Sequence, residues 1–292
     1  VEAKGSVPRG AGTKMIVTDQ GLHYGTIGGG NLEYQCIGVA KQRLSGADWQ
    51  RKVQRFPLGA SLGQCCGGVV IVLFEYIGTG QQVWLSDVLK HKAARQTVLL
   101  TTSLNHQTAA KQVALASAPS AVGLAEQTPD YLVETVKSND FNIVVFGAGH
   151  VGRALVNVLA GLECEVTWVD SRAEEFPETI PANVIKAVEP NPEDVVETAP
   201  VDSYFVVLTH SHSLDQLLCE RILTRSDFCY CGLIGSQSKR AKFEHRLRAK
   251  GFSEQQIATL TCPMGIPSLG GKQPGHIAVA VAAQLLEQQA SY

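Results

Sequence analysis

Two adjacent cysteines, Cys65 and Cys66, are the residues of this chain whose types and spacing most directly suggest chemistry. The loop around them is poor in side chains, because it contains Gly59, Gly63, Gly67 and Gly68. We therefore expect accessible sulfur atoms, and backbone amides close to a thiol favour its thiolate form. Adjacent cysteines seldom pair with each other, because the small ring is strained. The pair indicates soft-metal ligation or persulfide chemistry, with a buried structural turn as the alternative.

A glycine-spaced turn, Gly147-x-Gly149-x-x-Gly152, is the second feature that suggests chemistry. An apolar segment precedes it and a helical pattern follows it, as in turns that hold a phosphate. The first glycine permits the tight turn, the second lets a pyrophosphate approach the backbone, and the third allows close helix–sheet packing. Asp170 follows Gly152 by 18 residues and is predicted to accept a hydrogen bond from a ribose or another hydroxylated ring. A tight turn without a ligand is the alternative, and the motif alone does not specify nicotinamide chemistry.

A polar segment, Thr209–His212, follows an apolar strand pattern and is a further candidate site. Ligand crevices of open α/β sheets lie at the carboxyl ends of such strands. His210 and His212 are therefore predicted to bind an anion or to move protons, with Asp215 orienting one imidazole. The alternative is a polar loop in which Ser213 caps the next helix.

The other cysteines are interpreted mainly as structural residues. Cys36 and Cys164 lie among apolar neighbours, and Cys229 and Cys231 alternate along one strand, so we expect all four in a core. Cys262 follows an apolar run that returns to the same crevice, and a structural thiol is favoured there. No second pair of Cys or His residues gives zinc spacing, and eight cysteines in 292 residues do not resemble a secreted disulfide framework.

Two architectures are expected to position these residues. The N-terminal part is predicted to be mixed α/β, with strands over Met15–Thr18 and Val69–Phe74 around a helix over Leu32–Leu44. Asn31 is the expected N-cap of that helix, and Gly28, Gly29 and Gly30 form the turn before it.

The C-terminal part alternates strands with helices and is predicted to be a Rossmann-like, doubly wound parallel sheet. The expected strands and helices are Asn142–Phe146, Ala154–Leu162, Glu165–Val169, Tyr204–Leu208, Tyr230–Ile234 and Ile277–Gln288. We predict an N-terminal domain over residues 1–117, a connection over 118–138 and a C-terminal domain over 139–292.

The composition excludes several classes of protein. The formal net charge of −2 gives no broad basic field for nucleic acid or an anionic membrane. No stretch approaches the roughly 20 apolar residues that span a bilayer, and no signal peptide opens the sequence. We expect a cytoplasmic protein with reduced thiols and with a few native residues before Val1.

Several motifs occur in collinear order along nearly the whole chain and carry a family resemblance. They are Glu2–Arg9, Gly25–Glu33, Leu58–Gly68, Phe146–Arg153, Trp168–Arg172, Leu208–His212, Gly232–Ser236 and Cys262–Pro267. On these motifs the sequence resembles the xanthine dehydrogenase accessory protein family (XdhC/CoxI). The resemblance implies a homodimeric chaperone, rather than a turnover enzyme, that binds molybdenum cofactor (a molybdopterin). It also implies a role in cofactor sulfuration and insertion into apo-xanthine dehydrogenase, with a cysteine desulfurase as a second partner.

The resemblance also suggests roles for the candidate residues. Cys65 or Cys66 suits molybdenum as a soft thiolate ligand, with Gln64 and Gly67 beside it in the loop. The pterin phosphate is expected either at the turn Gly28–Gly30 or at the turn Gly147–Gly152. Arg9 and Lys14 are expected to add charge-assisted contacts. The second turn is also a candidate for a nucleotide, with Asp170, His210 and His212 around it.

Two alternatives come from other functional classes. An NAD-dependent oxidoreductase would use the C-terminal domain for its cofactor and Thr209–His212 for proton transfer, but it leaves the Cys65–Cys66 loop without a task. A structural scaffold for dehydrogenase subunits is the second alternative. The sequence leaves open the target molybdoenzyme, the mononucleotide or dinucleotide form of the cofactor, and the choice between molybdenum ligation and persulfide transfer.

Overall fold

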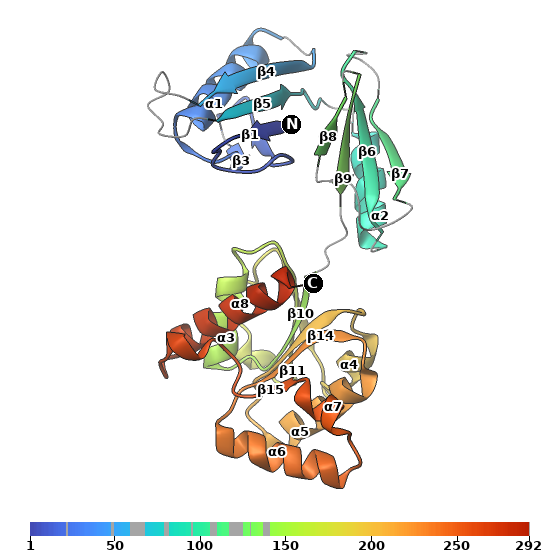
Figure 1. Cartoon of the computed structure of the whole chain (residues 1–292), viewed down its shortest axis with the longest axis vertical. Coiled ribbons are helices and arrows are strands. Elements are labelled where there is room, and N and C mark those ends of the chain that lie inside the picture. The colour runs from blue at the N-terminus through green and yellow to red at the C-terminus, as the bar shows by residue number, and fades with distance from the viewer. Residues whose placement is uncertain are drawn as a thin grey trace. The chain divides into compact units, whose positions relative to one another are not determined.

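The chain forms two compact units, Val1–Ser138 and Asn139–Tyr292 (Figure 1). The structure, a computed structural model, describes residues 1–21, 23–47, 50–58, 68–78, 82–94, 96–105, 110–116, 125–128, 130–136 and 141–291. None of the helices in these ranges is long and apolar enough to cross a membrane.

The first unit starts with a three-stranded antiparallel sheet packed on one helix. The elements are β1 (Glu2–Lys4), β5 (Val69–Phe74) and β4 (Lys52–Pro57) in sheet order, with helix α1 (Gly30–Ser45) and the hairpin β2 (Met15–Val17) and β3 (His23–Gly25). Alternate residues of β5, including Val70 and Val72, join the core cluster of Leu32 and Cys36 on α1. This alternation leaves the other face of β5 free to carry a different set of side chains.

The predicted strands and helix of this region are confirmed, with one correction at the helix start. Strands cover residues 15–17 and 69–74, and α1 contains the whole of the expected span. Asn31, however, lies inside the first turn, and the N-cap is Gly29 with φ 71°. The helix begins earlier than expected because the glycine backbone itself makes the turn into it.

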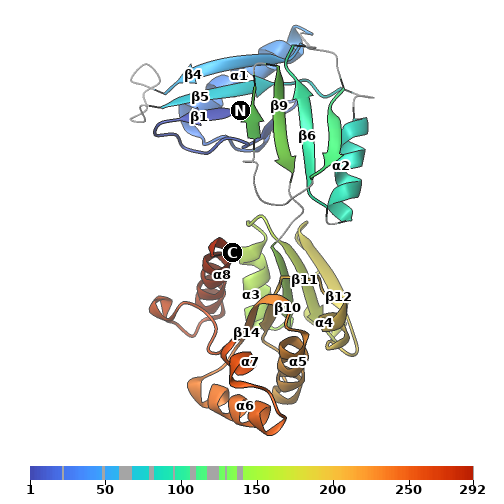
Figure 2. The ribbon, with the colours of Figure 1, turned by 45° about the vertical axis from the view of Figure 1, so that its right-hand side comes forward.

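A four-stranded antiparallel sheet completes the first unit. Its elements are β7 (Gln112–Leu115), β6 (Val98–Ser103), β9 (Tyr131–Val136) and β8 (Ala125–Gln127) in sheet order, with helix α2 (Val83–Ala93) packed near β7. The expected connection over residues 118–138 is therefore wrong in part. Residues 131–136 pair along all of β6 (Figure 2), and their mixed polar and apolar sequence reflects a strand with one buried face.

A chain of ion pairs, buried except at Lys14, links segments from both sheets of the first unit through the 3.8 Å approach of Lys111 Nζ to Glu134 Oε2. Glu75 accepts from Arg51 Nε at 2.7 Å and lies 2.6 Å from Lys111 Nζ. Glu134 on β9 pairs with Lys14 Nζ at 3.0 Å. Lys14, which we expected to contact a phosphate, is thus held by a carboxylate.

The second unit is a six-stranded parallel sheet, as predicted. Its elements in sheet order are β12 (Val184–Val188), β11 (Glu165–Asp170), β10 (Asn142–Phe146), β13 (Ser203–Val207), β14 (Phe228–Leu233) and β15 (Leu260–Thr261). Every residue of β10 and β13 is buried, as expected for central strands covered on both faces.

Helices cover the two faces of this sheet. Helices α3 (His150–Leu159) and α8 (Pro274–Ala290) lie side by side against one face (Figure 2), in the cluster of Ile143 and Val145. The other face, with Val144 and Phe146, is covered by α4 (Asp194–Thr198), α5 (His212–Arg225), α6 (Gln237–Ala249) and α7 (Glu254–Ala258). The helix expected over residues 154–162 actually runs from 150 to 159, because the glycine turn leads directly into it.

Candidate functional site

The first of the N-terminal motifs, residues 2–9, contacts the other two, and one of these contacts lies at the base of the cysteine loop. The Leu58 amide donates to Gly68 O at 2.8 Å, which ties the two ends of the loop together. A Cβ at Gly68 would lie 2.6 Å from Lys4 O and 2.5 Å from Ser6 O. A Cβ at Gly28 would lie 2.6 Å from Pro8 Cγ. The first motif therefore touches both the turn at residues 28–30 and the loop base, and only glycine permits either approach.

The thiol pair itself belongs to residues 59–67, which lie outside the described residues. Gln64, Cys65, Cys66 and Gly67 all fall in this segment. The segment joins the end of β4 to the start of β5, where Pro57 pairs with Val69. Its attachment to the hairpin is thus described on both sides, and Leu58 is 1% exposed.

The described cysteines are poor candidates for thiol chemistry. Cys36, Cys164, Cys219, Cys231 and Cys262 are buried and Cys229 is half-buried. Burial raises the pKa of Cys36 to about 12 and that of Cys164 to about 11. A thiol with so high a pKa is protonated at neutral pH and is a weak nucleophile and ligand. Within the described ranges, no three His, Cys, Asp or Glu side chains gather into a potential metal site.

The turn at residues 28–30 already holds a carboxylate. Glu33 Oε2 accepts from Thr26 Oγ1 at 2.6 Å and from the amides of Ile27 and Gly29 at 3.1 Å each. These bonds, led by that of Thr26, lower the pKa of Glu33. The carboxylate therefore occupies, in this conformation, amides that we expected to face a phosphate.

The turn at residues 147–152 needs two of its three glycines for packing. A Cβ at Gly147, where φ is +120°, would lie 2.5 Å from Leu208 O, and one at Gly152 would lie 2.1 Å from Gly147 O. Gly149 differs, because its φ is −70° and a Cβ there would meet nothing within 4 Å. The fold therefore gives no reason for glycine at 149. Its backbone faces open space, as the expected approach of a ligand requires.

Asp170 stabilises this turn from the end of β11. It is 5% exposed, and its Oδ2 accepts from the Ala148 amide at 2.7 Å. Arg172 donates three further hydrogen bonds, from Nε and its amide to Oδ1 and from Nη2 to Oδ2, each at 3.0 Å. Burial would raise the pKa of Asp170, but these hydrogen bonds outweigh it and the pKa is lowered. Four donors fill the acceptor positions of one carboxylate, so the expected hydrogen bond to a ribose would have to displace one of them.

A second arginine holds the same residue, Ala148, through its carbonyl group. Arg153 Nε donates to Ala148 O at 3.1 Å. Glu175 bridges the two arginines, with Oε2 2.7 Å from Arg153 Nη2 and Oε1 3.0 Å from Arg172 Nη1. Asp170, Arg153, Arg172 and Glu175 therefore form one network around Ala148.

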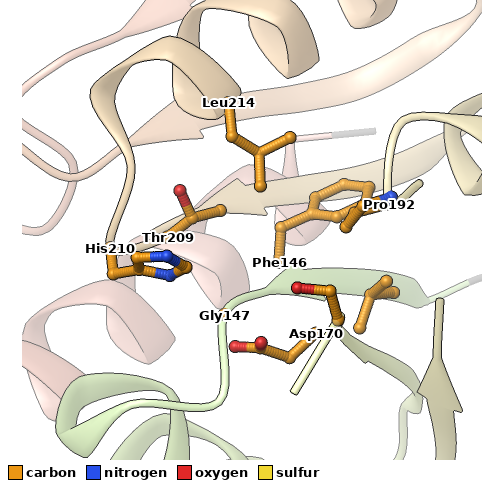
Figure 3. A pocket seen from close by; sticks show the side chains of 9 residues that line it. Phe146, Gly147, Asp170, Pro192, Thr209, His210 and Leu214 are labelled. Atoms are coloured by element: carbon orange, nitrogen blue, oxygen red, sulfur yellow. The ribbon is translucent and has the colours of Figure 1, made fainter. Parts of the chain in front are cut away.

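A crevice opens beside this turn at the carboxyl ends of β10, β11 and β13 (Figure 3). Apolar and polar residues line it together. They are Phe146, Gly147, Val169, Asp170, Ser171, Pro192, Thr209, His210 and Leu214. This is the place expected for a ligand in an open parallel sheet. His210 lies in the lining as predicted, whereas His212 is not among the lining residues and begins α5.

Two expectations around the histidines are corrected. Asp215 does not orient an imidazole. Its Oδ1 accepts from the amide and hydroxyl of Thr209, and its Oδ2 lies 2.7 Å from Lys239 Nζ. The N-cap of α5 is Ser211, whose Oγ accepts from Leu214 N, rather than Ser213. Asp215 is 1% exposed, so its role is to hold the Thr209 segment in place.

Sequence reasoning gave no role to Glu33 or to Arg172. Glu33 carried a usable signal, because an acidic residue four positions after Gly29 lies in the first turn of the helix and can reach back to free amides. The signal at Arg172 was weaker. It consisted only of an arginine two residues after Asp170, the acid expected to bind a ribose.

The sequence models of two related families match most of the chain. That of the XdhC and CoxI family matches residues 1–56, and that of the XdhC Rossmann domain matches residues 143–285. The "Uncharacterized protein YqeB" of Escherichia coli K12 is 25% identical over 299 residues, which cover 98% of this chain and 42% of that protein. The chain thus spans less than half the length of this relative.

A solved structure has a similar fold. It is a protein from Bacillus halodurans described as a xanthine dehydrogenase, with a TM-score of 0.78 and 19% identity. The likeness covers 99% of this chain and 89% of that one. It extends over both units and concerns the fold.

Proposed function

The chain belongs to the XdhC and CoxI family, and from that premise we propose that it is an accessory protein in the maturation of a xanthine dehydrogenase. Its cargo is molybdenum cofactor, which it binds, supports during sulfuration and inserts into the apoenzyme. A cysteine desulfurase is the partner that supplies the sulfur. The observation that carries the proposal is the contact of residues 4 and 6 with the tied base of the Cys65–Cys66 loop, together with the contact of Pro8 with the turn at residues 28–30.

The arrangement of cysteines supports this assignment. Molybdenum in the cofactor is bound by sulfur, and a soft thiolate suits the same metal. The described cysteines are buried or half-buried, which leaves Cys65 and Cys66 as the residues proposed to contact the cargo. The base of their loop is fixed in position, because Gly68 packs against the backbone of residues 4 and 6.

A loading experiment tests the proposal. The protein is co-expressed with cofactor biosynthesis and purified, and its molybdenum and its pterin fluorescence are measured per chain. We expect close to one cofactor per chain, falling by about 10- to 100-fold in Cys65→Ser and Cys66→Ser, the range seen when a metal-site interaction is removed. Cys229→Ser, a change at a half-buried thiol in the second unit, is the matched control and should load normally.

The same variants are then mixed with apo-xanthine dehydrogenase and sulfur donor, and the recovered activity is measured. Loading and activation equal to the wild type in both loop variants would contradict the proposal. It would also be contradicted by a wild-type protein that retains neither molybdenum nor pterin.

For the second unit we propose a nucleotide or another phosphorylated group in the crevice of Figure 3. The open backbone at Gly149 supports this proposal. The oxidoreductase alternative receives less support, because Arg172 already donates to both carboxylate oxygens of Asp170, the residue that would bind the ribose of NAD. Calorimetry with NAD and with simple nucleotides tests the difference, and micromolar NAD binding without retained pterin would favour the oxidoreductase.

A further inference from the structure

One face of the first sheet carries an unassigned hollow. Strand pairing places Ile71 between Glu2 and Arg55, and Val69 between Lys4 and Pro57. Because side chains alternate along a strand, these residues lie on the face of β5 opposite to Val70 and the α1 core. Glu2, Lys4, Arg55, Val69 and Ile71 line the hollow, and we refer to this surface as the open face.

The open face combines an apolar floor with positive charge at its edges. Val69 and Ile71 are half-buried, whereas Lys4 and Arg55 are exposed. Lys4 Nζ lies 2.6 Å from Glu2 Oε1, so one positive charge is balanced. Among the described residues Arg55 pairs with no carboxylate, which leaves the hollow with one net positive charge. A guanidinium with its donors free is well suited to a phosphate.

The open face includes strand residues that flank the thiol loop in the sequence. Residues 59–67 leave β4 just after Pro57 and return to β5 just before Val69. The row of Lys4, Val69 and Pro57 is therefore the last row of the sheet before the loop. The row of Arg55 follows two residues further along the strand, at about 7 Å.

We propose that the open face holds the phosphorylated ring system of the cargo, with Arg55 and Lys4 binding the phosphate. Val69 and Ile71 provide apolar contact for a planar heterocycle. The inference rests on the proposed function and adds the site of the anionic group. It also explains how a phosphate is held in the first unit although Glu33 occupies amides of the turn at residues 28–30.

A titration of variants that are expected to change the affinity for pterin in opposite directions tests the inference. Molybdopterin freshly released from a molybdoenzyme is added to the cofactor-free protein, and binding is followed by pterin fluorescence at low and at higher salt. Arg55→Gln should weaken binding by about 10- to 100-fold, as expected for a lost hydrogen bond between charged groups, and should reduce the salt dependence. Arg55→Lys should restore part of the affinity. Glu2→Gln should tighten binding, because it frees Lys4 from its ion pair.

Lys52→Ala is the matched control, because Lys52 is an exposed cation on the same strand whose position alternates to the opposite face. It should bind like the wild type, and circular dichroism should show the same fold in every variant. Normal binding by Arg55→Gln together with weak binding by Cys65→Ser or Cys66→Ser would overturn the open face and leave the accessory function standing. A wild-type protein that binds no pterin at all would overturn both.

Discussion

Two glycine-rich turns precede helices in this protein, one in each unit, and they differ in where their carboxylate comes from. The turn at residues 28–30 is closed by Glu33, from the first turn of the helix that it leads into. The turn at residues 147–152 is held by Asp170, which comes from the neighbouring strand β11. In the first case the acceptor is local, and in the second it depends on the assembled sheet.

This difference determines what remains open to a ligand. Glu33 reaches the amide of Ile27 and that of Gly29, which is one of the turn glycines. Asp170 takes the Ala148 amide, while Gly149 keeps open space in front of its backbone. Glycine spacing before a helix therefore does not by itself identify a phosphate site. The source of the nearest carboxylate has to be known as well.

The largest expected effect is a difference in stability between variants of Gly152, which is needed for packing, and of Gly149, which faces open space. In Gly152→Ala the new Cβ would lie 2.1 Å from Gly147 O, so the backbone must shift, and we expect a loss of about 3 kcal/mol or more of unfolding free energy. Gly149→Ala adds a methyl group to open space at an ordinary φ and should change stability by less than about 1 kcal/mol. Chemical denaturation of the two variants provides the comparison.

The same position then tests the crevice. Gly149→Val should fold like the wild type and lose binding of a phosphorylated ligand, because the branched side chain stands where the ligand approaches. If Gly149→Ala proved as unstable as Gly152→Ala, the space in front of residue 149 would be needed by the fold, and the contrast between the turns would fail.

The second effect concerns the carboxylate of the second unit. Asp170→Ala leaves the Ala148 amide without its acceptor and the Arg172 guanidinium with Glu175 alone, and it should lower the unfolding free energy by about 2 kcal/mol. Arg172→Ala should be milder, because Ala148 keeps its bond while Asp170 loses the two side-chain bonds of Arg172 and keeps the bond from the backbone amide of residue 172. Glu178→Ala, at an exposed acid outside the network, is the control and should be neutral. Equal stability of Asp170→Ala and the control would show that the network does not hold the turn.

Acid provides an independent measurement of the Asp170 network. The pKa of Asp170 is lowered in the folded protein, so its stabilising contribution is present above the unfolded value of about 4 and is lost as pH falls through the folded value. The wild type should therefore lose stability below about pH 4 more steeply than Asp170→Asn. Parallel stability curves for the two proteins in that range would contradict the lowered pKa.

Much of the second unit could be predicted from its sequence, because its signals are local. Apolar runs such as residues 142–146 are buried on both faces, and the parallel order follows from their alternation with helices. The strand at residues 131–136 was missed, because Glu134 sits on a buried face where its ion pairs with Lys14 and Lys111 make it acceptable. An ion-pair partner such as Lys14 is far away in sequence. The composition of the segment alone therefore indicates a connection.

The candidate sites show the same limit. Glycines 147 and 152 could be assigned from spacing, since their roles depend on one turn. The saturation of Asp170 by Arg172 and the pairing of Asp215 with Lys239 depend on side-chain directions that spacing does not fix. The open face was missed for a related reason. Lys4 and Arg55 become neighbours of Val69 and Ile71 only through strand pairing.

The smallest effect returns to the local carboxylate of the first unit. Glu33→Ala removes the acceptor of Thr26, Ile27 and Gly29 and should lower the unfolding free energy of this unit by about 1 kcal/mol, the usual cost of a lost helix cap. The pKa of Glu33 is lowered, so this contribution also disappears as pH falls through the folded value, below the unfolded value of about 4.3. Gln42→Ala, at an exposed position in the last turns of α1, is the control.

The Glu33 variant also decides between the turn at residues 28–30, which was expected to hold a phosphate, and the proposed open face. If Glu33 only closes the turn, Glu33→Ala should keep its affinity for released molybdopterin, because Arg55 and Lys4 still bind the phosphate. If the turn amides bound the cargo, removing the competing carboxylate would free them, and the affinity would rise well above that of the wild type. Thermal unfolding and pterin titration on the same preparation separate these outcomes. A rise in affinity would place the phosphate at the turn and make the two glycine turns alike after all.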